Sequence, residues 1–191
     1  MKILNAVTAS LMLAAMPVLA HADDMSYRYF QLGYLETDID GVSSHADGFG
    51  TRGAIGFAEN FFLFTEYSAQ EVANIDVDQY AVGLGGHYAM SDTVDLVGRA
   101  GWTKVEASVS GTGGGSFDDD GYLVAAGVRG QVGEYVQLEA GVIYQDFGGG
   151  SDDTGAELAA RYHFNKRWAA AVEYQDIGEL STIMAGVRVS F

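Results

Sequence analysis

His87 and Asp95 are the residues whose types and spacing come nearest to catalytic chemistry. Each lies four positions from Ser91, so a hairpin turning at Ser91 would place the imidazole beside the carboxylate. A base oriented by a carboxylate is part of a catalytic triad, which also needs a nucleophile within reach of the base. Ser91 would lie in the turn itself and is not placed to attack a substrate. We therefore interpret His87 and Asp95 as a structural pair and expect no enzyme activity.

Other pairs of opposite charge are also arranged about short breaks in the sequence. In two of these pairs, Arg52 with Glu66 and Arg129 with Glu139, both members are equally far from a break. In the third, Arg161 with Glu173, the members are about one diagonal step away from that symmetry. Antiparallel hairpins bring such residues into contact. A charge in a narrow interior with little water needs a partner, because an unpaired one costs several kcal/mol. The spacing predicts a ladder of structural ion pairs inside the protein.

Cofactor and metal motifs are missing from the sequence. The glycine-rich stretch at 111–116 lacks the lysine and the following helix of a phosphate-binding loop. The chain has no cysteine, and no histidine spacing resembles a zinc site. Acidic stretches predicted to be loops could hold divalent cations that bridge to lipid phosphates, although a solvated surface is the simpler interpretation. We expect no cofactor and no resident metal.

Residues 1–22 have the composition of a secretory signal peptide. Lys2 precedes a long apolar stretch, and Ala20 and Ala22 supply the small residues before a cleavage site. No other apolar run approaches the roughly 20 residues of a membrane-spanning helix. The net charge of −16 argues against nucleic acid as a partner, which requires clustered basic residues. The sequence thus predicts an exported domain at 23–191.

In that domain apolar and polar residues alternate with a period of two over segments of strand length. Four short breaks take turns with five longer, acidic, glycine-rich ones, which predicts ten strands. The expected strands are 27–37, 47–57, 61–70, 77–89, 93–104, 119–131, 134–145, 154–164, 167–175 and 181–191. These lengths suit the roughly 9–11 residues that a tilted strand needs to cross the hydrocarbon layer.

The two faces of these strands differ in a way that indicates a membrane protein. One face is aliphatic with aromatics near the strand ends, as expected for residues at the two bilayer interfaces. The other face is small and polar and carries the paired charges. In lipid every backbone group must be satisfied internally, which a closed barrel achieves. We therefore predict an all-β, closed, antiparallel up-and-down barrel of ten strands, with eight as the alternative.

Several segments resemble the small bacterial outer-membrane β-barrel domain family, the OmpA-like and OmpX-like group. They are "YRYFQLGY" in the first strand, "NFFLFTEYS" after the first short turn, "AVGLGGHYAMSDTVDLVGRAGW" across the second, and the terminal Phe191. The resemblance implies a location in the bacterial outer membrane, a barrel that is monomeric or weakly associating, and lipid or lipopolysaccharide as surroundings. It also implies that Phe191 is the insertion signal for the barrel-assembly machinery.

The expected function is a structural or surface-interaction role. A barrel of this size has an interior that its own side chains can fill, so the lumen should be plugged while acidic loops face outside. The alternative is a narrow pore or passive transporter for small solutes. Arg188 should face the lumen, where the neighbouring first strand offers Gln31 but no obvious carboxylate.

Overall fold

The computed structural model describes residues 25–41, 44–109, 115–148 and 151–191, so the predicted signal peptide at 1–22 lies outside the described residues. The described chain forms ten strands: β1 (Tyr29–Ile39), β2 (Ala46–Ala58), β3 (Phe61–Val72), β4 (Ile75–Ser91), β5 (Val94–Val109), β6 (Ser116–Val132), β7 (Val136–Phe147), β8 (Ser151–His163), β9 (Trp168–Ile177) and β10 (Leu180–Ser190). None of the described residues form a helix long and apolar enough to span a membrane.

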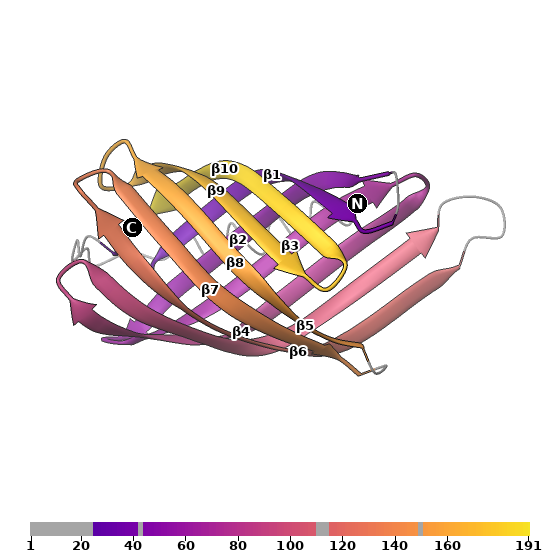
Figure 1. Ribbon diagram of the computed structural model, residues 1–191, viewed down its shortest axis with the longest axis horizontal. Helices are drawn as coiled ribbons and strands as arrows, with labels where there is room; N and C mark the ends of the chain where they lie inside the picture. Colours follow the sequence, from indigo (N-terminus) through magenta and orange to yellow (C-terminus); the bar gives the residue numbers. More distant parts are fainter. Residues whose placement is uncertain (1–24, 42–43, 110–114, 149–150) are drawn as a thin grey trace.

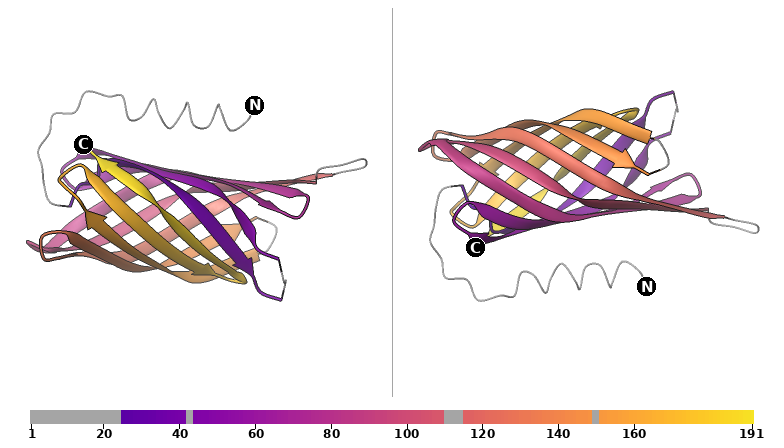
Figure 2. Two further views of the ribbon diagram at one scale, coloured as in Figure 1. Left: turned by 90° about the horizontal axis from the view of Figure 1, so that it is seen from above. Right: turned by 90° about the horizontal axis from the view of Figure 1, so that it is seen from below.

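The strands close into a single antiparallel barrel (Figure 1). Every strand pairs with its neighbours in sequence, and β1 pairs with β10 from Tyr29–Ser190 to Ile39–Leu180. The strands run obliquely around the barrel in both further views (Figure 2). Closure leaves no edge strand along the wall, as a protein in lipid requires. The prediction of ten strands is confirmed over the alternative of eight.

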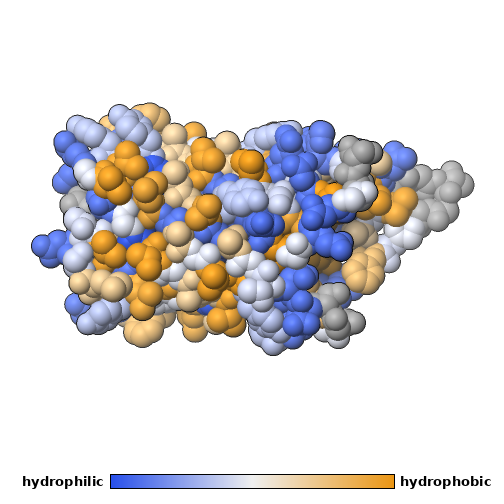
Figure 3. Space-filling model, viewed as in Figure 1, coloured by the Kyte–Doolittle hydropathy of each residue, from blue (hydrophilic) through white to orange (hydrophobic). Residues whose placement is uncertain are grey.

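Alternation along each strand sorts the side chains between lipid and lumen. Large apolar residues are exposed on the outside, for example Leu84, Val142 and Phe49, which are 56%, 59% and 63% exposed. Charged residues such as Arg161 and Glu173 are each only 4% exposed, because they point inward. Figure 3 shows apolar residues over much of the barrel wall and hydrophilic residues toward both ends of the barrel. This is the reverse of a soluble core.

The two ends of the barrel differ in their connections. One end carries Phe191 and the connections β2–β3, β4–β5, β6–β7 and β8–β9, and we call it the short-turn end (Figure 1). The opposite end carries the β5–β6 hairpin, which projects beyond the rest of the barrel, and we call it the long-hairpin end. Outer-membrane barrels keep short turns in the periplasm and longer connections outside. The long-hairpin end is therefore the one expected to face outward.

Two connections predicted as long loops are tight turns instead. Strands β3 and β4 pair up to Val72–Ile75, and the turn between them uses Ala73 at a φ of 54°. Strands β9 and β10 pair up to Ile177–Leu180, and their turn uses Gly178 at a φ of 60°. The acidic composition suggested loops, but paired strands tolerate charge where they stand in water above the membrane. Most of the predicted loop carboxylates consequently lie on strand ends.

Candidate functional site: the barrel lumen

The lumen has an apolar side and an ionic side. Residues of β2 to β6, together with Tyr27 just before β1, form a buried cluster: Tyr27, Ala54, Phe62, Phe64, Ala81, Val97 and Leu123. Facing it, β7 to β10 contribute most of the buried charges, among them Arg161, Glu173 and Arg188. The sequence pattern predicted the polar lining but not the aromatic residues within it. In "FFLF" Phe61 and Leu63 face outward, while Phe62 and Phe64 face the lumen. Because all four residues are apolar, the sequence does not distinguish the two pairs.

Glycines on β4 and β5 make room for these inward rings. A Cβ added at Gly85 would lie 2.2 Å from the ring of Phe62, and one at Gly83 would lie 2.7 Å from the ring of Phe64. Real Cβ atoms do not approach other atoms so closely. At Gly85 the ring is the nearest obstacle, whereas at Gly83 the backbone oxygen of Ala100 on β5 lies closer than the ring, at 2.2 Å, so the backbone of β5 also requires glycine there.

The structure places Arg52 opposite Glu66 and Arg129 opposite Glu139 in the strand register. Arg129 donates from Nε to Glu139 at 3.0 Å and forms the tighter contact. Arg52 lies 3.9 Å from Glu66 but only 3.0 Å from Oε2 of Glu173, three strands away around the barrel. Spacing about a turn thus identifies residues that lie opposite each other on neighbouring strands. It does not identify the shortest contact, which depends on how the curved wall brings more distant strands together.

Glu173 is the centre of the ionic side. It contacts Arg52, Arg161 and Arg188, with Arg161 Nη2 at 3.2 Å and Arg188 Nη2 at 3.4 Å from Oε1. Arg161 is one diagonal step from Glu173 in the register, since Ala159 is the residue directly opposite. Arg188 lies opposite Gln31 and donates to its Oε1 at 2.8 Å. The carboxylate partner of Arg188 therefore comes from β9 and not from β1.

Arg99 crosses the lumen, which spacing along the sequence could not reveal. Its guanidinium contacts Glu66 on β3, and its Nη2 donates to both carboxylate oxygens of Glu157 on β8 at 2.7 Å. Glu157 also accepts a hydrogen bond from Gln175 at 2.6 Å. We call the residues joined in this way the lumenal belt: Arg52, Glu66, Arg99, Arg129, Glu139, Glu157, Arg161, Glu173 and Arg188.

Three belt arginines stack on aromatic rings, which joins the ionic side to the apolar side. Arg188 lies 3.6 Å above Tyr29, Arg129 lies 4.5 Å above Tyr27, and Arg99 lies 5.5 Å from Phe64. A desolvated cation over a ring gains about 2 kcal/mol. The aromatic rings therefore stabilise the same charges that the carboxylates neutralise.

His87 and Asp95 meet near the short-turn end, but in a different register from the expected one. A bulge between Ala89 and Ser91 places Asp95 opposite Ala89 and His87 opposite Val97. The imidazole still reaches Asp95, with Nδ1 at 3.5 Å from Oδ2. Asp95 accepts a hydrogen bond of 2.7 Å from Tyr27.

The third group at this pair is a phenol rather than a serine. The ring of Tyr27 stacks on His87 with centroids 4.0 Å apart. Sequence spacing did not indicate this contact, because Tyr27 precedes β1 and is far from His87 along the chain. The contacts hold the segment before β1 inside the barrel mouth.

The belt separates two large cavities. A cavity of about 550 Å³ lies toward the long-hairpin end, where its wall includes Leu35, Ile143 and Gln145. A second of about 790 Å³ lies at the short-turn end, between Tyr27, His87 and Phe191. Among the belt residues the cavity has only about 30 Å³, enough for about one water molecule. Within the described part of the chain, the lumen is therefore narrowest among the belt residues.

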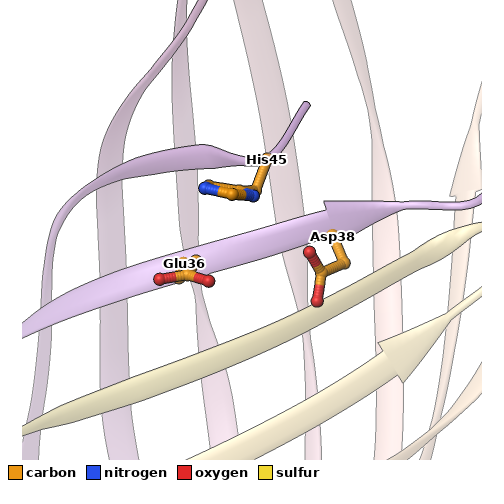
Figure 4. A group of neighbouring side chains, drawn as sticks. All are labelled: Glu36, Asp38 and His45. Carbon is orange, nitrogen blue, oxygen red and sulfur yellow. The ribbon is translucent and has the colours of Figure 1, made fainter. Parts of the chain in front are cut away.

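A group of possible metal ligands lies outside the lumen, at the rim of the long-hairpin end. Glu36 and Asp38 on β1 and His45 just before β2 bring three ligand atoms within 4.8 Å of one another (Figure 4). All three residues are exposed, and an exposed group of this kind does not by itself define a metal site. Spacing in the sequence did not single out His45.

Solved structures with a similar arrangement are outer-membrane proteins of low sequence identity. The attachment invasion locus protein Ail of Yersinia pestis has a TM-score of 0.47 and 16% identity, covering 87% of this chain and all of that one. The N-terminal barrel domain of Pseudomonas aeruginosa OprF has a TM-score of 0.47 and 10% identity, with 87% of this chain and 100% of that chain covered. The KdgM porin, solved in complex with oligogalacturonate, has a TM-score of 0.46 and 16% identity, and the match covers 84% of this chain and 99% of that chain.

The family is assigned by a different comparison. No curated protein matches the chain in sequence. The sequence family described as the outer membrane protein β-barrel domain matches residues 6–164, which is most of the chain. The match spans the strands that build the apolar side of the lumen and most of those that carry the belt. With its closed ten-strand barrel, apolar wall and polar lumen, the chain belongs to the outer membrane protein β-barrel domain family and is a protein of the bacterial outer membrane.

Proposed function

We propose that this protein is a structural and surface-interacting barrel whose lumen is closed by the lumenal belt. The observation that carries the proposal is the contact of Arg99 with both Glu66 on β3 and Glu157 on β8, two strands that lie opposite each other in the ring of ten. Together with Arg52 bound to Glu173, it fills the cross-section at mid-height. A route for solutes would have to break ion pairs in a region with almost no water, where freeing one buried charge costs about 3–5 kcal/mol.

The balance of charge in the lumen also supports a plug. Five arginines face four glutamates and one aspartate: Arg52, Arg99, Arg129, Arg161 and Arg188 with Glu66, Glu139, Glu157, Glu173 and Asp95. Selective ion pores present a ring of charges of one sign to the permeating ion. A neutral, internally paired set has no such excess, and its role is to stabilise the barrel.

The surface role rests on the long-hairpin end. Strands β4, β5 and β6 are the longest in the barrel, and β5–β6 projects beyond the rim (Figure 1). On this projection Lys104 contacts Glu106 at 2.8 Å and Asp118 at 3.4 Å, while Phe117 is 62% exposed. A rigid projecting sheet with mixed charged and apolar side chains suits contact with a molecule outside the cell.

The proposed partners follow from the same placement. Lipid and lipopolysaccharide surround the wall, and exposed carboxylates near the rim can bind divalent cations that neutralise lipid phosphates. Phe191 lies at the short-turn end, where the proposed assembly machinery reads the terminal strand. Every ion pair of the belt lies within one chain, which is compatible with the proposed monomer. None of these roles requires a nucleic acid or a catalytic step.

A narrow pore is the second candidate function, and the two large cavities are the observation in its favour. Only the belt separates them, so a rearrangement there would connect the two ends of the lumen. Planar-bilayer conductance of the purified, refolded protein distinguishes the two proposals. A plugged barrel gives no steady single-channel steps, whereas reproducible steps from the unmodified protein would reject the plug and support the pore.

A further inference from the structure

The cavity at the long-hairpin end has the size and lining of a small-molecule site. Its volume of about 550 Å³ lies within the range of about 300–1,000 Å³ that is typical of ligand pockets. Four of its wall residues are apolar side chains that point inward from different strands: Leu35, Leu123, Ile143 and Met184, which are between 2% and 4% exposed. These apolar residues face a cavity and not a packed core.

Glutamines interrupt this apolar wall, and two of them have no partner. Gln145 is 8% exposed, and its side-chain amide forms no hydrogen bond with any residue in the described part of the chain; the same holds for Gln79. By contrast, Gln70 donates to Thr37 at 2.7 Å and Gln175 donates to Glu157 at 2.6 Å. An amide facing an apolar cavity without a partner is costly. Gln79 and Gln145 are therefore available to a molecule inside the cavity.

The charges around the cavity argue against an anionic occupant. At its floor, Arg52 and Glu66 are both engaged within the belt. Toward the long-hairpin end, Asp153 and Glu179 contribute acidic groups to the lining. Among the described lining residues no free cation is available to an anion, which Asp153 and Glu179 would also repel, and the four apolar wall residues carry no charge that would bind a cation.

We propose that this cavity is a binding site for an uncharged amphipathic small molecule, an amide or alcohol with a compact apolar body. The apolar part contacts Leu123 and Ile143, and the polar group exchanges hydrogen bonds with Gln79 and Gln145. The ligand enters and leaves from the long-hairpin end, because the belt closes the other side. This proposal is independent of conduction, since binding needs only one open end.

The test uses 4-fluorobenzamide as the probe and its ¹⁹F transverse relaxation rate as the measurement. The full barrel is refolded into lipid nanodiscs, and empty discs of the same lipid correct for partition into the bilayer. Binding appears as relaxation above that of empty discs, saturating at millimolar probe. The anion 4-fluorobenzoate, which has the same ring, should show no such excess. Equal relaxation of 4-fluorobenzamide with and without the protein overturns the proposal.

Three variants locate the site. Leu123→Trp fills the cavity and should abolish the excess relaxation, while Gln145→Leu keeps the side-chain size and should weaken binding about tenfold. Gln131→Leu, at the short-turn end, should leave binding unchanged. Heat-modifiable gel migration shows which variants are folded, and only folded ones are compared. Binding that survives both cavity variants, or that is lost equally in Gln131→Leu, rejects this location.

Discussion

Arg99 and Glu157 form a salt bridge across the barrel, although β6 and β7 separate their strands along the wall. Both carboxylate oxygens lie 2.7 Å from the same nitrogen of Arg99. Neighbouring strands in a barrel are held by backbone hydrogen bonds in any case. This side-chain contact has a different consequence, because it links β5 to β8 through the lumen, and the same guanidinium also contacts Glu66 on β3, the strand opposite β8 in the ring of ten.

Removing this bridge should open the lumen. In the double variant Arg99→Ser with Glu157→Ser both charges of the bridge are removed together, and Glu66, the other partner of Arg99, keeps Arg52 at 3.9 Å. We expect the variant to produce single-channel steps in planar bilayers or solute flux in proteoliposomes, where the unmodified barrel produces none. The matched control is Lys104→Ser with Asp118→Ser, an exposed pair on the β5–β6 projection, which should remain silent. A silent Arg99 and Glu157 variant would show that other belt residues suffice to close the lumen.

Glu173→Gln should be among the most destabilising single changes in the barrel. The substitution preserves shape but removes the charge that Arg52, Arg161 and Arg188 share. We expect a loss of about 3 kcal/mol in the free energy of unfolding, the scale for breaking a buried pair. Urea unfolding in lipid vesicles, followed by tryptophan fluorescence, measures this loss. Glu134→Gln, in an exposed turn, should stay within about 0.5 kcal/mol of the unmodified protein.

Adjacent glycines on β4 allow a sharp test of the inward aromatic packing. A Cβ at Gly85 would lie 2.2 Å from the ring of Phe62, whereas the nearest atoms to a Cβ at Gly86 are 3.4 Å away. Gly85→Ala should therefore cost about 1–3 kcal/mol through overpacking. Gly86→Ala should be close to neutral. The same urea unfolding measurement compares them, and equal effects would mean that Phe62 moves aside without cost.

The sequence predicted the architecture because a barrel in lipid has a strong local signal. Alternation has a period of two, so the residues that face lipid and those that face the lumen separate along each strand without knowledge of the fold. Symmetry about a turn paired Arg129 with Glu139, which lie opposite each other in the register. It also paired His87 with Asp95, and these side chains do meet. They are not directly opposite, because a bulge between Ala89 and Ser91 shifts the register, and the residue types give no sign of the bulge.

Contacts across the lumen could not be predicted from spacing. The bond between Arg99 and Glu157 and the contact of Arg52 with Glu173 depend on the diameter and stagger of the closed barrel, and not on neighbouring strands. The inward position of Phe62 was hidden for a different reason. In the run "FFLF" both faces of the strand carry apolar residues, so the sequence does not show which of them points inward. The glycine that faces Phe62, Gly85, was the feature that could have indicated its inward position.

The stacking of Arg188 on Tyr29 explains why the terminal strand carries an arginine. Their contact is 3.6 Å from guanidinium to ring centre, and a double-mutant cycle of Arg188→Lys and Tyr29→Leu isolates it. Lysine keeps the charge but loses the planar stack and the bond to Gln31, so Arg188→Lys alone should be destabilising. We expect a coupling energy of about 2 kcal/mol between the two sites, measured by urea unfolding in vesicles. Tyr29→Phe retains the ring and should preserve the coupling. A coupling near zero would mean that Arg188 is held by Gln31 and Glu173 alone.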